Sequence, residues 1–161
     1  MTTPRWLTDE EQALWRLLLD TSRQAQRCME EQLQSVHDLS YSEFSVLVSL
    51  SEAPGTEIRL RDLCLALTWD RSRTSHQITR MERRGLVTKC KCSGDARGVV
   101  VELTDEGRRR LDAAAPQHVE LVRRMIFDRL AADDIPALRR FCEKVLEVTG
   151  ASRLSEYPPK Q

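Results

Sequence analysis

Apolar side chains change their spacing partway along the chain, and this change limits the possible fold more than any other feature of the sequence. Before Gly85 they recur every three or four residues, as on one face of a helix. Residues 86–92 and 98–103 alternate instead, as strands do, and only five residues separate them. The sequence therefore predicts a mainly α-helical protein with one small β-hairpin.

Four helices are expected before this hairpin, at residues 8–34, 41–52, 60–67 and 71–84. Thr8 and Glu11 have the spacing of a capping box, in which each side chain bonds to the backbone N–H of the other residue. Ser40 is a suitable cap for the second helix. Gly85 suits the left-handed backbone that commonly ends a helix, so the fourth helix is expected to stop there.

Two more helices are expected after the hairpin. Thr104 can cap a long helix whose first turn holds two acidic residues, and acids are favourable at that end of a helix. Pro116 is expected to bend or interrupt this helix. Asp133 is expected to cap a last helix over about 135–149. The tail, 151–161, contains two consecutive prolines and is expected to be loose.

Charge is distributed unevenly although the chain has 25 basic and 25 acidic side chains. Residues 1–70 carry six Lys and Arg against twelve Asp and Glu, and residues 99–161 carry eleven of each. Residues 71–98 carry eight against two, which leaves an excess of six positive charges within one short window. An excess of this size favours a surface that binds a polyanion over an ordinary solvated helix face.

The same composition gives an expectation about location. No apolar run approaches the roughly 20 residues that a membrane-spanning helix needs. The first residues lack the apolar segment of a secretion signal. We therefore expect a cytoplasmic protein without a membrane partner, in which the five cysteines are reduced thiols.

Two short helices joined by a tight turn and followed by a β-hairpin describe a winged helix-turn-helix, here expected over residues 40–104. The helix at 71–84, called the reading helix from here on, would enter the major groove of double-stranded DNA. Its predicted exposed face carries the side-chain types that read base edges: Ser72, Arg73, His76 and Gln77. The next arginines are expected to hold phosphates: Arg80, Arg83 and Arg84.

Thr74 and the hairpin tip complete the predicted DNA contacts. Thr74 falls on the apolar stripe of the reading helix, with Ile78 and Met81, yet its hydroxyl could also reach DNA, and the sequence leaves both possibilities open. At the tip, Asp95 and Arg97 project to one side, so that Arg97 can enter a minor groove and Asp95 can orient an arginine. The alternative is that helix and hairpin only support each other.

The outer helices, 8–34 and 105–149, are long and apolar on one face. Packing against a second copy would bury that face, so a single domain over 1–161 with N- and C-terminal dimerisation helices is expected. A two-fold dimer places two reading helices about 34 Å apart, one turn of DNA, which matches a palindromic operator.

The chain resembles the MarR (multiple antibiotic resistance regulator) family of bacterial transcription factors over about residues 8–148. The similarity rests on Leu60-Arg61-Asp62-Leu63-Cys64, on the run from Ser72 to Val87, and on the wing pattern Asp95-x-Arg97 followed by Leu103-Thr104-x-x-Gly107. The resemblance implies an obligate homodimer that binds palindromic promoter DNA, usually as a repressor, and that a small molecule or an oxidant releases. Thr74 departs from the larger aliphatic residue often found at its position.

A thiol switch is the first hypothesis for the releasing signal. Cys90 and Cys92 lie two apart on a predicted strand, and the nearby Lys89, Lys91 and Arg97 favour the reactive thiolate. Both cysteines could equally be small packing residues under the wing. The remaining redox candidates are less informative, because two fall on apolar stripes and one at a stripe edge: Cys64, Cys142 and Cys28.

A small aromatic inducer is the alternative, bound between the dimer helices and the DNA-binding lobe and lined by Trp15, Phe44 and Trp69. Metal sensing is disfavoured because the histidines are scattered, and no metal site or cofactor is expected. No catalytic motif appears, so a cysteine-dependent enzyme is disfavoured. A pure interaction adaptor would leave the basic window without a purpose.

Overall fold

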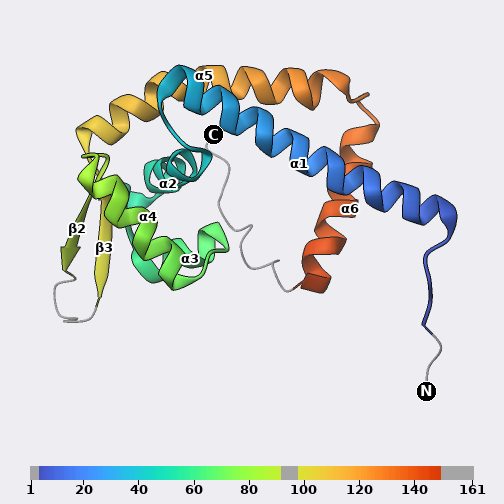
Figure 1. Cartoon of the computed structure of the whole chain (residues 1–161), viewed down its shortest axis with the longest axis horizontal. Coiled ribbons are helices and arrows are strands. Elements are labelled where there is room, and N and C mark those ends of the chain that lie inside the picture. The colour runs from blue at the N-terminus through green and yellow to red at the C-terminus, as the bar shows by residue number, and fades with distance from the viewer. Residues whose placement is uncertain (1–3, 92–97, 150–161) are drawn as a thin grey trace.

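The computed structural model describes residues 4–91 and 98–149, and it is mainly helical with one small sheet (Figure 1). Its elements follow in chain order: α1 (Asp9–His37), α2 (Tyr41–Glu52), the 3-10 turn η1 (Pro54–Thr56), β1 (Glu57–Arg59), α3 (Leu60–Leu67), α4 (Arg71–Arg83), β2 (Val87–Lys91), β3 (Val99–Leu103), α5 (Asp105–Met125), the 3-10 turn η2 (Phe127–Arg129) and α6 (Asp134–Thr149).

These elements form a small lobe crossed by two long helices. Helices α2, α3 and α4 and the sheet make up the lobe, while α1 and α5 run side by side across it and extend beyond it (Figure 1). Helix α6 follows η2 and runs downward, behind α1 in the view of Figure 1. The predicted fold class, a winged helix-turn-helix with long outer helices, is confirmed.

The helix starts agree with the capping signals in the sequence. Thr8 and Glu11 form the predicted capping box, with the Thr8 N–H donating to the Glu11 carboxylate at 2.8 Å and the Glu11 N–H to the Thr8 hydroxyl at 3.2 Å. Ser40 caps α2 as predicted, and Glu43 completes a second capping box there. Gly85 follows α4 with a left-handed backbone, φ +71°.

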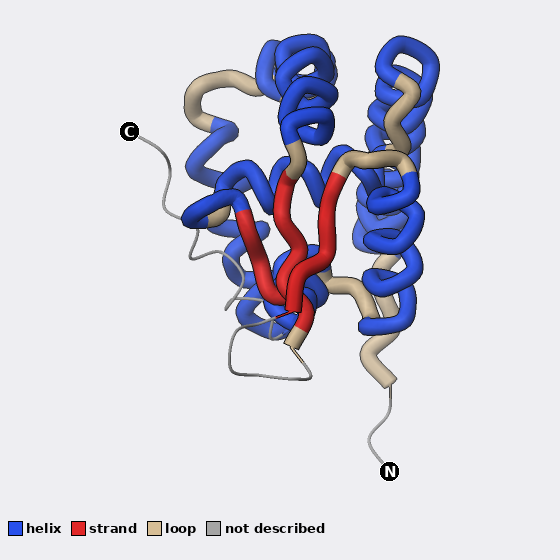
Figure 2. The backbone as a smooth tube through the Cα atoms, turned by 90° about the vertical axis from the view of Figure 1, so that its left-hand side faces the viewer, coloured by secondary structure: helices blue, strands red, loops and turns tan. Residues whose placement is uncertain are grey.

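The sheet has three antiparallel strands in the order β1–β3–β2, which lie side by side at one edge of the lobe (Figure 2). Strands β2 and β3 form the predicted hairpin. In the structure Val87 lies opposite Leu103 and Lys91 lies opposite Val99. The sequence did not predict β1, whose Ile58 lies opposite Val101. Three residues are too few to show an alternating pattern, so β1 is defined only by its pairing with β3.

The core fills the space between the lobe helices and the sheet. Helix α4 contributes the predicted stripe of Thr74, Ile78 and Met81, each fully buried. The other buried apolar residues come from α1, α2, α3, the sheet and α5: Leu33, Leu39, Phe44, Val46, Leu47, Leu50, Leu63, Leu86, Val87, Val101, Leu111 and Ala114. The reading helix is thus seated on a continuous core.

The C-terminal helices depart from the prediction. Helix α5 continues through Pro116 and ends only at Met125, so Pro116 does not interrupt it. Pro116 lies on an exposed position, where water can bind the carbonyl that loses its helical partner. The break lies at 126–133 instead. Near its end the carboxylate of Asp134, the residue after the predicted cap Asp133, accepts the N–H of Ala131 at 2.9 Å.

The Leu-Thr-x-x-Gly pattern has a clear structural reason. The Thr104 hydroxyl caps α5 by accepting the Gly107 N–H at 3.0 Å, and it donates to the carbonyl oxygen of Gly85 at 2.7 Å. At Gly107 a Cβ atom would lie 2.1 Å from the Leu86 carbonyl oxygen and 2.9 Å from a methyl group of Leu103. The end of α4, the end of β3 and the start of α5 therefore meet at one close-packed corner.

We predict that Gly107→Ala lowers the free energy of unfolding by about 3 kcal/mol, because the new methyl group displaces backbone. Gly85→Ala is the matched control. A Cβ there would have no atom within 4 Å, so only the left-handed backbone penalises it, by about 1 kcal/mol. Urea unfolding at fixed protein concentration measures both variants. Equal losses for the two variants would contradict the close-contact explanation.

Candidate nucleic-acid interface

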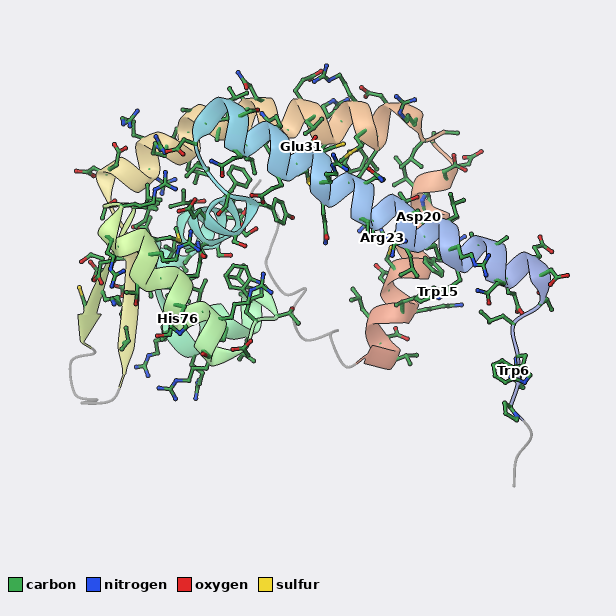
Figure 3. The ribbon with its side chains drawn as sticks, in the orientation of Figure 1. Trp6, Trp15, Asp20, Arg23, Glu31 and His76 are labelled. Atoms are coloured by element: carbon green, nitrogen blue, oxygen red, sulfur yellow. The ribbon has the colours of Figure 1, made fainter. Side chains whose placement is uncertain are left out.

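Helix α4 presents a polar, basic face on the outside of the lobe. Its N-terminus is capped by Asp70, whose carboxylate accepts the Arg73 N–H at 2.8 Å. Ser72, Arg73 and His76 are exposed and Gln77 is half-buried, and Figure 3 shows His76 on this helix. The four predicted base-reading side chains therefore come from one helix, whose buried side chains pack into the core.

Thr74 does not belong to this face. Its side chain is fully buried, and its hydroxyl donates to the carbonyl oxygen of Asp70, one turn earlier, at 2.9 Å. The expectation that Thr74 could contact DNA is therefore wrong. The hydroxyl is satisfied within the helix, which is how a threonine fits where a larger aliphatic residue is common.

Arg73 has an additional partner. Its guanidinium lies over the ring of Trp69, 4.4 Å from the ring centroid, which is a cation–π contact. A stacked guanidinium keeps its N–H donors at the edge of the plane, where they can bind a base or phosphate. The turn between α3 and α4 thus fixes the position of a predicted DNA-reading side chain.

The three predicted phosphate-binding arginines divide into two groups. Arg80 and Arg83 are exposed at the last turn of α4. Arg84 instead turns toward α1 and α2, where it donates to Glu43 and Asp38 at 2.7–2.9 Å. The expectation that Arg84 holds phosphate therefore does not fit the structure, because its guanidinium is engaged within the protein.

More basic side chains lie beside the reading helix than the sequence window suggested. A cavity of about 320 Å³ between α3, β1 and the start of β3 is lined by Arg59, Arg61, Arg71 and Cys64, among others. Arg59 and Arg61 precede the basic window and were missed. Their nearness to α4 comes from the pairing of β1 with β3, which the sequence did not reveal.

Asp95, Arg97 and Cys92, all predicted as site residues, lie outside the described residues. Lys89, at the described base of the wing, bonds to Glu82 of α4 at 2.8 Å, which ties β2 to the reading helix.

Cys90 lies in surroundings that differ from the prediction. It is half-buried on β2, and Glu102 on β3 is its diagonal neighbour. The hydrogen bond from the thiol to the Glu102 carboxylate raises the pKa of Cys90 above its usual value, and burial and the Glu102 charge act in the same direction. The expectation that nearby lysines favour a Cys90 thiolate is wrong, since the charges that act on its pKa are those of Glu102, Glu57 and Glu82, and each raises it.

The other described cysteines are spread over three helices. Cys28 on α1 and Cys142 on α6 are exposed, and Cys64 on α3 is half-buried. Cys64 and Cys142 were expected to be core residues. Cys142 is not, because every residue from 131 to 148 is exposed in the single chain.

The predicted aromatic pocket is not assembled as expected. Phe44 is a core residue whose ring lies 4.5 Å from that of His118. Trp15 is half exposed near the other end of α1 (Figure 3). Trp69 lines a cavity of about 790 Å³ between α1, α2 and the α3–α4 turn, and neither Trp15 nor Phe44 is among the residues lining it.

That cavity has mainly polar and charged walls. Arg23, Arg27 and Glu30 come from α1, and Arg73 from the reading helix. The α1 residues were missed, although Arg23, Arg27 and Glu30 recur at helical spacing and could have been recognised as one polar stripe. The cavity therefore lies between an outer helix and the DNA-binding lobe, with cations from both.

No three His, Cys, Asp or Glu side chains come together as a metal site within 4–91 and 98–149. Nor is any helix in those ranges long and apolar enough to cross a membrane.

The comparisons with known proteins agree with this geometry. The family described as "Transcriptional regulator SarA/Rot" matches residues 29–114, more than half of the chain. AbsC, a MarR family transcriptional regulator from Streptomyces coelicolor, is 39% identical, with 91% of this chain and 96% of that chain covered and a TM-score of 0.83. A second Streptomyces coelicolor MarR family regulator, solved in complex with DNA, is 36% identical, with 89% and 91% covered and a TM-score of 0.86.

A curated relative adds a function. The homoprotocatechuate degradative operon repressor of Escherichia coli is 29% identical over 122 residues, 76% of this chain and 80% of that protein. Fold and basic reading helix together define a winged helix-turn-helix DNA-binding protein. The chain belongs to the MarR family of transcriptional regulators. It is thus a regulator that binds DNA, and its relatives are not enzymes.

We predict that Cys90 is alkylated by iodoacetamide more slowly than the exposed Cys28, because a raised pKa leaves less thiolate at neutral pH. Glu102→Gln should speed the labelling of Cys90, since it removes the negative charge beside the thiol. Glu120→Gln, a carboxylate on α5 that is not among those raising this pKa, is the matched control. Peptide-level mass spectrometry of the folded protein measures the rates, and an unchanged rate in Glu102→Gln would refute the assignment.

Proposed function

We propose that the protein is a homodimeric repressor that binds palindromic promoter DNA through two copies of α4. The observation that carries this proposal is the exposed, basic face of α4 seated on a fixed core. Support comes from two of the relatives reported above. One was solved in complex with DNA, and the other is an operon repressor. Asp95 and Arg97 are proposed to act from the wing, in the minor groove.

The dimer is supported by apolar side chains that the single chain leaves exposed. They lie mainly on the outer half of α1 and on α6: Leu14, Trp15, Leu17, Leu18, Leu19, Ile135, Leu138 and Phe141. So many exposed large apolar side chains are typical of a protein interface. We therefore propose that α1 and α6, with the end of α5, pack against a second copy around a two-fold axis.

We predict that Phe141→Glu weakens dimerisation strongly, because it buries a charge in that interface. Arg139→Gln is the matched control, since it changes the net charge equally from the same helix while removing no apolar surface. Sedimentation over a range of protein concentrations measures the effect. A dimer of unchanged stability in Phe141→Glu would show that α6 is not part of the interface.

The reading of DNA can be tested by variants of α4. Gln77→Ala should relax the preference at particular base pairs by about 1–3 kcal/mol, because a bidentate contact to a base is lost. Arg80→Gln should weaken binding to all sequences and reduce the slope of log affinity against log salt by about 1. Arg129→Gln, on η2 and away from α4, is the control.

These affinities are measured by fluorescence anisotropy on a duplex that the wild-type protein selects from a randomised library. An unchanged set of selected sequences for Gln77→Ala would contradict the placement of α4 in the major groove. The same duplex gives the repressor test, in which a promoter containing it is transcribed with and without the protein.

Two releasing signals are proposed, and different observations support each. Thiol oxidation is supported by the exposed Cys28 and Cys142, and by Cys92 on sequence grounds, but the raised pKa of Cys90 weakens the case for that residue. A small aromatic acid is supported by the cavity beside α4, where Trp69 offers a ring and Arg23, Arg27 and Arg73 offer positive charge. Peroxide and benzoate, added separately to the DNA complex, distinguish the two.

A further inference from the structure

Four charged side chains meet where the outer helices join the DNA-binding lobe. Asp38 follows α1, Glu43 lies in α2, Arg84 ends α4 and Arg110 lies in α5. We propose that this cluster sets the position of the reading helix relative to the dimer helices. Arg84 is then a positioning residue that acts through α4, and not a contact to DNA.

Both terminal nitrogens of Arg84 bind carboxylates within the protein. One terminal nitrogen, Nη1, donates to both carboxylate oxygens of Glu43 at 2.8 and 2.9 Å. The other, Nη2, donates to the carbonyl oxygen and to the carboxylate of Asp38, both at 2.7 Å. Both terminal nitrogens of the guanidinium thus donate within the protein.

Breaking these bonds would be unfavourable because Glu43 is almost fully buried. Besides the Arg84 bonds, its carboxylate accepts the N–H and the hydroxyl of Ser40, at 2.9 and 3.1 Å. A buried carboxylate that loses its cation is strongly destabilised, so Arg84 is held in place whether or not DNA is present.

Asp38 connects this pair to the outer helices. Its backbone is left-handed, φ +50°, as α1 ends and the chain turns into α2. Its carbonyl oxygen and carboxylate also accept from Arg110 of α5, at 3.0 and 3.2 Å. Both α1 and α5, which run side by side over the lobe (Figure 1), therefore hold the C-terminal end of α4 through one residue.

The consequence concerns the distance between the two reading helices. A dimer can match a palindrome only if each α4 keeps its position on the outer helices, and here the position is set by directional bonds to one guanidinium. This step rests on the proposed dimeric repressor. A lysine could not replace Arg84, because a single ammonium cannot serve both carboxylates with the geometry of the fork.

The experiment compares Arg84→Gln with Arg83→Gln, which removes the neighbouring exposed arginine. We expect Arg84→Gln to weaken binding to the selected duplex by about 3- to 30-fold. It should also reduce the preference for that duplex over versions with one base pair inserted or removed at the centre. Its salt slope and its affinity for a non-selected duplex should not change, whereas Arg83→Gln should lower both. Arg84→Lys should behave like Arg84→Gln.

Two results would overturn the proposal. A salt slope reduced by about 1 in Arg84→Gln and restored in Arg84→Lys would identify a phosphate contact. Unchanged affinity and unchanged spacing preference would show that the cluster does not position α4. If Arg84→Gln does not fold, Asp38→Asn gives the same test, because asparagine tolerates the left-handed backbone and the Asp38 side chain is 70% exposed. A wild-type protein that selects no sequence would instead contradict the proposed function.

Discussion

The hydroxyl of Thr104 is the contact on which the DNA-reading surface depends. It binds the end of α4 through the Gly85 carbonyl and the start of α5 through the Gly107 N–H. Because β3 ends at the preceding residue, the same atom joins the wing, the reading helix and an outer helix. A serine could donate and accept likewise, but the absence of a side chain at Gly107 is what lets these backbones approach so closely.

The corner around Thr104 separates the DNA-reading helix from the outer helices, and each side has its own exposed surface. On one side, α4 buries Thr74, Ile78 and Met81 and exposes its basic face. On the other, α1 and α6 carry the exposed apolar side chains for which a second copy is the proposed cover. The Asp38 and Arg84 bonds connect the two sides a second time, from the opposite face of α4's end, so that the helix is held by hydrogen bonds from two directions.

Much of this arrangement could be predicted from the sequence, because local signals determine it. Capping residues such as Thr8 and Ser40 and the stop at Gly85 define helix ends within a few residues. The features that were missed depend on partners distant in sequence. β1 exists through β3, Arg84 turns inward because Glu43 is buried 41 residues away, and Cys90 meets Glu102 only once the hairpin has formed. The lysines beside Cys90 in the sequence predicted a lowered pKa for its thiol, whereas Glu102, a neighbour only in the folded hairpin, raises that pKa.

The uneven charge has a consequence for how the molecule meets DNA. The acidic start of α1 and the basic face of α4 lie at opposite parts of the molecule (Figure 1). A chain without net charge feels little overall attraction toward a polyanion, but separated charges give it an electric dipole. The field of DNA therefore exerts a torque rather than a pull, and it turns the molecule before contact. This orientation operates only within about 10 Å at 0.1 M salt, so encounters become productive at short range.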